Sequence, residues 1–459
     1  MTEEASSTPP PSPAEDGPPR KRSRAVGCAT VAITLVAVLC IFVIAWALHV
    51  RRSTDRFVRH VGAMLAEHEA SRPAVPEGEN AAPLYTAAFT LYDLTNEAGL
   101  IEGLPDPKKD YTTAQVGQYL ADNKAYLAAL RKAAARPKCD FELDLSKGID
   151  LPVPHVSETR RAVRSLAVAA RNAAQSGRPD EALEHLALAL RLARDVGGDE
   201  LLISRMVQIA CEGIALHGLE NVLNESEPGQ GAARRFLDAL TEQVRTRPNL
   251  ANVLQGERHV VLAYLSRLMT GKAELHLDAI HWLGEPPEYM KVPEPLWKAA
   301  GLALMDARHY ERIMGCAIIE AGKPYPGALA GLEKIDKEGL VSVPKWALAT
   351  RLLLPTFSRI ATNDARVLAL LRAARVALGC RLYRVRFGAY PKDLKELAAK
   401  LPEHFREVPL DPFTDKPLFY QRTKTGCKVY STGEDRTDNG GLSGSPNAFL
   451  PDVVFELDR

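Results

Sequence analysis

The chain has 459 residues, and its 58 lysines and arginines nearly balance its 57 aspartates and glutamates, so the formal net charge is +1. This length provides for two or three domains of roughly 100 to 200 residues, and the balanced charge excludes both a chain that coats nucleic acid and an acidic, solvating chain. The seven cysteines are widely spaced and include no Cys-x-x-Cys pair, which argues against a disulfide framework and against a structural zinc site.

The N-terminal segment predicts a disordered tail followed by a membrane anchor. Residues 1–24 are rich in Pro, Ser and Glu and are too polar to form a core. Residues 25–50 contain no charged side chain, and as a helix they extend about 39 Å against a hydrocarbon thickness of about 30 Å. A cleaved signal peptide ending at Ala45-Trp46-Ala47 is the alternative, but this apolar stretch is longer than a signal peptide needs. We therefore expect a single transmembrane helix, with the lipid bilayer as one partner.

The basic residues on the two sides of this span are balanced, so they do not determine its orientation in the membrane. Basic residues precede and follow it in equal number: Arg20, Lys21, Arg22 and Arg24, then Arg51, Arg52, Arg56 and Arg59. Long domains translocate largely regardless of such charges, and a short tail left inside is the simpler topology. We predict a single-pass protein of the inner (cytoplasmic) membrane, with its short N-terminal tail inside and its main body extracytoplasmic.

Residues 51–355 are predicted to form an all-α domain, or two such domains. Apolar residues recur at helical spacing, and proline-rich breaks interrupt the pattern. Thr112 and Gln115 have the spacing of a capping box. Besides a hairpin near the middle, we expect helices near 83–100, 113–135, 199–223, 231–246, 251–269 and 297–321.

The sharpest helical pattern is an apolar stripe between Pro179 and Arg194, formed by Leu183, Leu186, Leu190 and Ala193. Pro179 stands at a first helical position, and Gly197-Gly198 follows the end. With a preceding helix that carries Leu166, Ala169, Ala170 and Ala173, this segment resembles one tetratricopeptide hairpin turning at Gly177. An ordinary antiparallel pair in a larger bundle is the alternative. Either form of the helix pair is expected to contribute to the hydrophobic core and to contain no catalytic residue. If the chain binds a protein partner, we expect the helical region to provide the surface.

No common catalytic or nucleotide-binding motif occurs in the sequence: GxGxxG, GxxxxGK[ST], GxSxG and HExxH are all missing. His276 and His281 would lie about 140° apart on a helix, and Asp278 would point elsewhere, so no shared metal face results. The alternative to a structural protein is a hydrolase-type membrane-bound enzyme whose active site no motif identifies. A pocket that gathers His, Glu and Asp with shifted pKa values would favour it.

The region 356–459 is predicted to be an α+β domain. A helix over 358–387 carries one apolar stripe, and a short helix over 392–401 follows. Strands are expected at 418–422, 427–431 and 453–457, the first two around a turn at 423–426. Between Ala365 and Lys392 there are seven basic residues and no acidic residue. They are suited to an acidic partner, but their scatter around the helix favours a solvated face.

Several ordered motifs in this region resemble the soluble domain of the type II secretion major pseudopilin: Gly388-Ala389-Tyr390-Pro391, Pro409-Leu410-Asp411-Pro412-Phe413, Pro417-Leu418-Phe419-Tyr420 and Val429-Tyr430-Ser431-Thr432-Gly433-Glu434-Asp435. The resemblance implies a pilin-like module whose final loop binds calcium. By correspondence Asp435 and Asp452 are the loop ligands, Asp438 is a substitute ligand, and Ser431 lies close by. The processing site of that family is missing at the membrane span, so assembly into a pseudopilus is not implied.

The loop beginning at Asp435 is also typical of a calcium site without any family comparison. Between Asp435 and Gly441, oxygen-bearing side chains cluster beside glycines that permit a tight wrap, as a hard cation that takes six to eight oxygen ligands requires. Pro446 stands where an EF-hand needs its bidentate glutamate, which excludes that motif. The alternative is an exposed turn without metal. In total the sequence predicts a mainly α, membrane-anchored extracytoplasmic bacterial protein with a structural or interaction role, calcium as its cofactor and no nucleic-acid partner.

Overall fold

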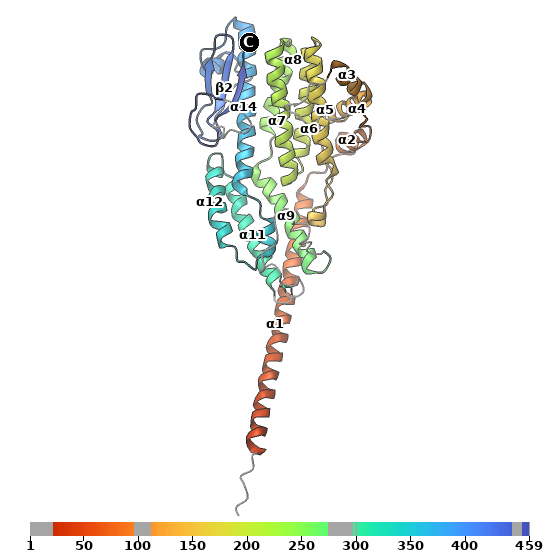
Figure 1. The fold of residues 1–459 in the computed structure, drawn as a ribbon, viewed down its shortest axis with the longest axis vertical. Coiled ribbons are helices and arrows are strands. Elements are labelled where there is room, and N and C mark those ends of the chain that lie inside the picture. The colour runs from red at the N-terminus through yellow and green to blue at the C-terminus, as the bar shows by residue number, and fades with distance from the viewer. Residues whose placement is uncertain (1–21, 96–111, 274–296, 299–300, 443–451, 459) are drawn as a thin grey trace, which may run out of the picture. The chain divides into compact units, whose positions relative to one another are not determined.

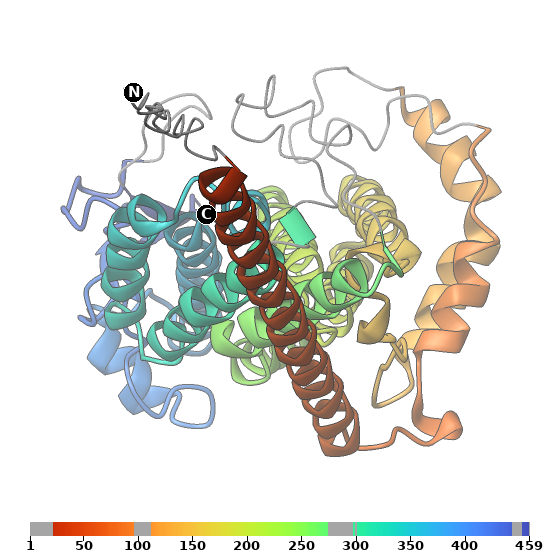
Figure 2. The same ribbon diagram turned by 90° about the horizontal axis from the view of Figure 1, so that it is seen from below.

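The computed structural model describes residues 22–95, 112–273, 297–298, 301–442 and 452–458. The described chain is mainly helical and carries one small antiparallel sheet near its C-terminus, as predicted (Figure 1, and Figure 2 from below). It divides into two compact units, Met1–Arg56 and Phe57–Arg459. Most of the predicted disordered tail, the histidines at 276 and 281, and the proline at 446 lie outside the described residues.

The first unit consists of most of helix α1 (Arg22–Ser71), whose turns from Phe57 onward belong to the second unit. Its stretch from Thr30 is long and apolar enough to cross a membrane, with a mean hydropathy of 2.9 in the most apolar window. Side chains such as Ile33, Ile41 and Phe42 are exposed along it. This agrees with the one predicted span. The helix continues past residue 50 because no proline interrupts it before Pro73.

After the last turns of α1, the second unit continues with small helices and then with long ones. The short 3-10 turns are η1 (Glu77–Glu79) and η2 (Leu145–Asp150). The helices are α2 (Ala82–Phe89), α3 (Thr113–Asp122), α4 (Lys124–Ala134), α5 (Pro154–Gln175), α6 (Pro179–Gly197), α7 (Leu202–Glu225), α8 (Gln230–Arg245), α9 (Leu250–Met269), α11 (Leu302–Ala321), α12 (Gly327–Ser342), α13 (Leu348–Leu353), α14 (Phe357–Phe387) and α15 (Leu394–Lys400). The predicted helices from residue 199 onward are therefore confirmed, within a few residues at each end.

Two predicted helices differ from the structure. The helix expected over 113–135 is broken into α3 and α4 at Asn123, which is buried. The Asn123 side chain accepts a hydrogen bond from the Asp93 amide at 3.0 Å and donates one to the Tyr119 carbonyl at 3.1 Å. An asparagine that bonds backbone groups in this way competes with the helix. The helix expected over 83–100 ends at Phe89, and Asp93 then forms a turn by accepting the Thr95 amide.

The hairpin of α5 and α6 forms as predicted and faces the core. Gly177, with φ of 73°, ends α5, and the amides of Gly177 and Arg178 bond the carbonyls of Ala174 and Ala173. This is the Schellman arrangement, which needs a left-handed residue and therefore favours glycine. The predicted stripe is buried throughout: Leu183, Leu186, Leu190 and Ala193. Helix α7 packs against both members of the pair.

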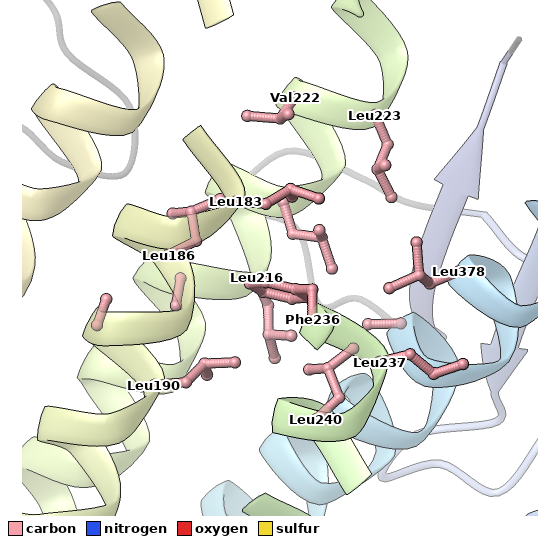
Figure 3. Packing of buried hydrophobic residues seen from close by; sticks show 14 of the residues in the cluster. Leu183, Leu186, Leu190, Leu216, Val222, Leu223, Phe236, Leu237, Leu240 and Leu378 are labelled. Atoms are coloured by element: carbon pink, nitrogen blue, oxygen red, sulfur yellow. The ribbon is translucent and has the colours of Figure 1, made fainter. Parts of the chain in front are cut away.

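Two hydrophobic clusters form the core of this unit, and α14 contributes to both. The first joins α4 to α8 with the later part of α14 and the sheet, and Figure 3 shows part of it, with Leu186, Leu216, Phe236 and Leu378 contributed by α6, α7, α8 and α14. The second joins α9, α11 and α12 with the beginning of α14. Because α14 is shared, the predicted regions 51–355 and 356–459 have a continuous core across residue 356.

The sheet comprises β1 (Phe419–Arg422), β2 (Cys427–Ser431) and β3 (Val453–Leu457), in the spatial order β1-β2-β3 with both pairs antiparallel. The three strands agree with the prediction. Ser431 at the end of β2 pairs with Val453 at the start of β3. The long loop between these strands therefore leaves β2 and enters β3 at the same end of the strand pair, where Asp452 directly precedes β3.

A buried ion network links the helices on either side of α14. Asp364 of α14 bonds the Arg205 guanidinium at 2.8 Å and the Arg247 guanidinium at 2.9 Å. Arg247 also contacts the carboxylate of Glu212, and Tyr325 donates its hydroxyl to Asp364 at 2.9 Å. Burial opposes ionisation of Asp364, but Arg247 and Arg205 outweigh burial and hold its pKa below the usual range. The amides of Gln208 and Gln243 complete the hydrogen bonding of Glu212.

Candidate functional site

The loop between β2 and β3 brings two of the predicted ligands together. The Asp452 carboxylate is 3% exposed, and its Oδ2 accepts the Gly441 amide at 2.8 Å. Its Oδ1 is buried and accepts no hydrogen bond of good geometry among the described residues, although the amides of Asn439 and Leu442 lie close to the carboxylate. Burial raises the pKa of Asp452, and the nearby Asp438 carboxylate raises it further, against the backbone amides around it. An unpaired carboxylate oxygen beside a second acid is a suitable environment for a cation.

Asp438 faces the same region from the loop. Its Oδ1 accepts the Tyr430 hydroxyl at 3.0 Å and the Gly440 amide at 2.9 Å. Burial and the neighbouring Asp438 raise the pKa of Tyr430 to about 12, and Asp452 adds to this effect. The Tyr430 hydroxyl therefore lies within the electrostatic reach of both acids and remains a neutral donor at physiological pH.

The glycines that follow Asp438 allow the loop to wrap closely. Gly440 and Gly441 have φ values of 74° and 68°, which residues other than glycine rarely adopt. A Cβ on Gly441 would also lie 2.6 Å from the Lys428 side chain and 2.9 Å from the Tyr430 ring. The Gly441 carbonyl accepts the Lys428 ammonium at 3.1 Å. The close wrap that the sequence predicted for these glycines is therefore present.

Asp435, the other predicted loop ligand, holds the exposed side of the loop. Its two carboxylate oxygens accept the Thr437 amide at 2.9 Å and the Asn439 side-chain amide at 3.1 Å. It also lines a cavity beside α12 and α14 that includes Arg359 and Arg366. The structure thus connects Asp435 to the region of Asp438 and Asp452 through Asn439, and its own carboxylate is engaged within the loop.

Ser431 belongs to a separate buried cluster around Asp411. The Asp411 carboxylate accepts the hydroxyls of Ser431 at 2.7 Å and of Thr432 at 3.0 Å, and the amides of Thr432 and Phe413. The Ser431 hydroxyl in turn accepts the Gly433 amide. Asp411 is fully buried and its oxygens are satisfied by these donors. The sequence does not indicate this role of Asp411, although it contains both motifs that Asp411 joins, Pro-Leu-Asp-Pro-Phe and Tyr-Ser-Thr-Gly.

A group that combines serine, histidine and aspartate lies between α5 and α7. His155 Nε2 lies 2.7 Å from Asp199 Oδ2, and the Ser204 hydroxyl donates to the same oxygen at 2.6 Å. Serine and histidine therefore both bond the carboxylate, whereas nucleophilic catalysis needs serine bonded to the histidine base. All three side chains are buried. This cluster ties α5 to the start of α7. In the part of the chain that the structure describes, no group of three or more His, Cys, Asp or Glu residues is arranged to hold a metal.

Comparison with protein-family models, with curated proteins and with solved structures gave no match for this chain.

Proposed function

We propose that this chain is a single-pass, membrane-anchored extracytoplasmic bacterial protein with a structural or interaction role, whose C-terminal module binds calcium. The observation that carries the calcium proposal is the buried, unpartnered Oδ1 of Asp452 beside Asp438. Calcium takes carboxylate and carbonyl oxygens in a flexible shell. Asp452 and Asp438 would supply carboxylate ligands of this kind. The short tail is proposed to lie inside and the body outside, as expected from the sequence.

The order of elements supports a pilin-like C-terminal module. A 31-residue helix, α14, is followed by the short α15 and then by the three-stranded antiparallel sheet, which packs on α14. This is the order that the pseudopilin resemblance implies. The continuous core between this module and the helical region favours a fixed body in which α2 to α12 present a surface to a protein partner.

The anchor proposal predicts how the chain behaves when its first 50 residues are removed. The full-length protein is expected to fractionate with membranes, and the truncated protein to be soluble and folded, because residues from Phe57 onward form their own compact unit. Fractionation of both forms, with circular dichroism of the truncated one, provides the check. Full-length protein in the soluble fraction, or cleavage after Ala47, would contradict the proposal.

The calcium proposal predicts that calcium raises the melting temperature of the full chain in detergent, relative to chelator. A ligand that binds only the folded state stabilises it by about 2.7 kcal/mol at a hundred times its dissociation constant. Magnesium is expected to act weakly, because it demands a tight octahedron. Differential scanning calorimetry in calcium, magnesium and chelator measures these shifts.

Single substitutions distinguish the ligands of the proposed site. Asp452→Asn and Asp438→Asn are expected to abolish the calcium shift, and Glu434→Gln, an exposed acid of the same loop, is the matched control. Asp435→Ala distinguishes a site formed by Asp438 and Asp452 from the site that the resemblance implies, formed by Asp435 and Asp452. Loss of the calcium shift in this variant would support the second pair, and an unchanged shift would support the first. Equal melting temperatures of the unaltered protein in calcium and in chelator would leave the loop as an ordinary turn.

A further inference from the structure

A cavity of about 550 Å³ lies between the α8–α9 junction, the segment after α11, helix α14 and residues 407–415. This volume is within the range of sites that bind small molecules, about 300 to 1,000 Å³. The apolar side chains of its lining include Val244, Leu250, Leu368 and Val408. The lining also contains five cationic and four acidic side chains, which come from distant parts of the chain.

Most of these charges are already compensated. Arg205 and Arg247 are neutralised by Asp364 and Glu212 in the buried network. Asp411 is satisfied by the hydroxyls and amides described above. Lys323 pairs with Glu320 at 2.5 Å. The remaining acids of the lining, Glu407 and Asp415, are both exposed.

Two arginines of α14 differ from this pattern. Arg372 and Arg375 are half-buried, lie one turn apart and line the same cavity. Each donates to one backbone carbonyl, Arg372 to Leu410 at 2.6 Å and Arg375 to His404 at 2.5 Å. Within the described residues, neither forms an ion pair with a carboxylate, and the buried Nε of Arg375 has no hydrogen-bond partner. Burial lowers the pKa of Arg375, and the neighbouring charge of Arg372 lowers it further.

The start of helix α9 adds positive potential to the same cavity. Asn249 caps this helix, and both Asn249 and Leu250 line the cavity. The N-terminus of a helix favours negative charge because its first amides lack intrahelical partners and its dipole is positive there. Arg372 lies within the electrostatic reach of Asp411 and Asp415 without an ion pair to either, and the Arg375 guanidinium lies over the Phe405 ring, 4.9 Å from its centre. Two guanidinium groups that form no ion pair among the described residues and a helix N-terminus thus converge on a cavity whose walls are partly apolar.

We propose that this cavity binds a small organic anion, a phosphate monoester or a carboxylate with an apolar body, through Arg372 and Arg375. Guanidinium groups bind both kinds of anion with paired hydrogen bonds. The apolar side chains of the lining cover the remainder of the ligand. This proposal is independent of the membrane anchor and of the calcium site.

Isothermal titration calorimetry of the full chain in detergent, with chelator present, tests the proposal. Phenyl phosphate and benzoate are the anionic probes, and benzyl alcohol at matched ionic strength is the neutral control. Saturable binding of either anion is expected, with benzyl alcohol much weaker, and the better anion identifies the head group. Binding of neither anion, or of benzyl alcohol equally well, would overturn the proposal.

Variants assign the binding to the two arginines. Arg372→Gln and Arg375→Gln are each expected to weaken anion binding by about tenfold or more, because each removes a charged hydrogen bond. Arg386→Gln, an exposed arginine later in the same helix, should leave the affinity unchanged. If the first two variants fail to fold, Glu407→Gln and Asp415→Asn test the same site, since removing an acid from the lining should tighten anion binding. Unchanged affinity in these variants would count against the cavity.

Discussion

Replacing Asp364 with asparagine is expected to lower the free energy of unfolding by about 3 to 5 kcal/mol, the cost of removing one partner from a buried ion pair. Asp364 bonds both Arg205 and Arg247, and the side chains of all three are nearly inaccessible to solvent. The variant keeps the shape of the side chain but leaves two guanidinium groups facing only the carboxylate of Glu212. The loss therefore comes from an uncompensated buried charge and not from a cavity.

The pH dependence of stability provides a second measurement of the same carboxylate. The folded-state pKa of Asp364 is lower than its value of about 3.9 in the unfolded chain. Its ionised form therefore stabilises the protein fully above about pH 5, and this stabilisation is lost as the pH falls through the unfolded and then the folded pKa. We expect the unaltered protein to lose more stability between about pH 5 and pH 3 than the Asp364→Asn variant does.

Urea unfolding of the full chain in detergent, at several pH values, measures both effects. Asp238→Asn is a suitable control, because Asp238 is exposed and its carboxylate lies 3.7 Å from the His404 ring nitrogen, beyond hydrogen-bond distance. Surface substitutions of this kind usually change stability by less than about 0.5 kcal/mol. A variant at residue 364 that is as stable as the control, with the same acid dependence, would show that the network contributes little.

Local patterns in the sequence predicted the elements well, and tertiary contacts account for the differences. The stripe through Leu186 repeats at the helical period, and the first two strands flank a turn at 423–426, so these elements are readable from their own residues. The break at Asn123 depends on Asp93, thirty residues earlier in the chain, so no local pattern indicates it. Asp364 and Arg247 are separated by 117 residues and meet only in the folded chain.

The basic residues of α14 are less exposed than their positions around the helix predict. Their scatter around the helix favoured a solvated face, which holds for a helix that has one buried side. Helix α14 instead contacts α7, α8 and α12 as well as the strands β2 and β3, so several of its faces are covered. Arg381 is consequently buried and bonds the Leu223 carbonyl, and Arg372 and Arg375 are directed to the cavity. For the terminal loop, the sequence indicated the acids but not which of them lie together.

Replacing Leu186 with aspartate is expected to lower the free energy of unfolding by on the order of 3 kcal/mol or more. Leu186 is fully buried within the first hydrophobic cluster (Figure 3). Helix α7 approaches it so closely that a Cβ on Gly218 would lie 2.8 Å from its side chain. An aspartate there loses the packing of leucine and buries a carboxylate among apolar groups, where it is expected to become protonated or to unfold the hairpin.

The matched control for this substitution is Ile319→Asp, which places the same charge on α11 at a side chain that is 69% exposed. Thermal unfolding followed by circular dichroism should separate the two variants by many degrees, with the control close to the unaltered protein. If both variants melted together with the unaltered protein, the stripe from Leu183 to Ala193 would face solvent and the hairpin would not form the core. A lower melting temperature for Leu186→Asp alone would confirm that this stripe packs α5 to α8 against one another. The leucine side chain makes no hydrogen bond, so the loss of a polar contact could not explain the result.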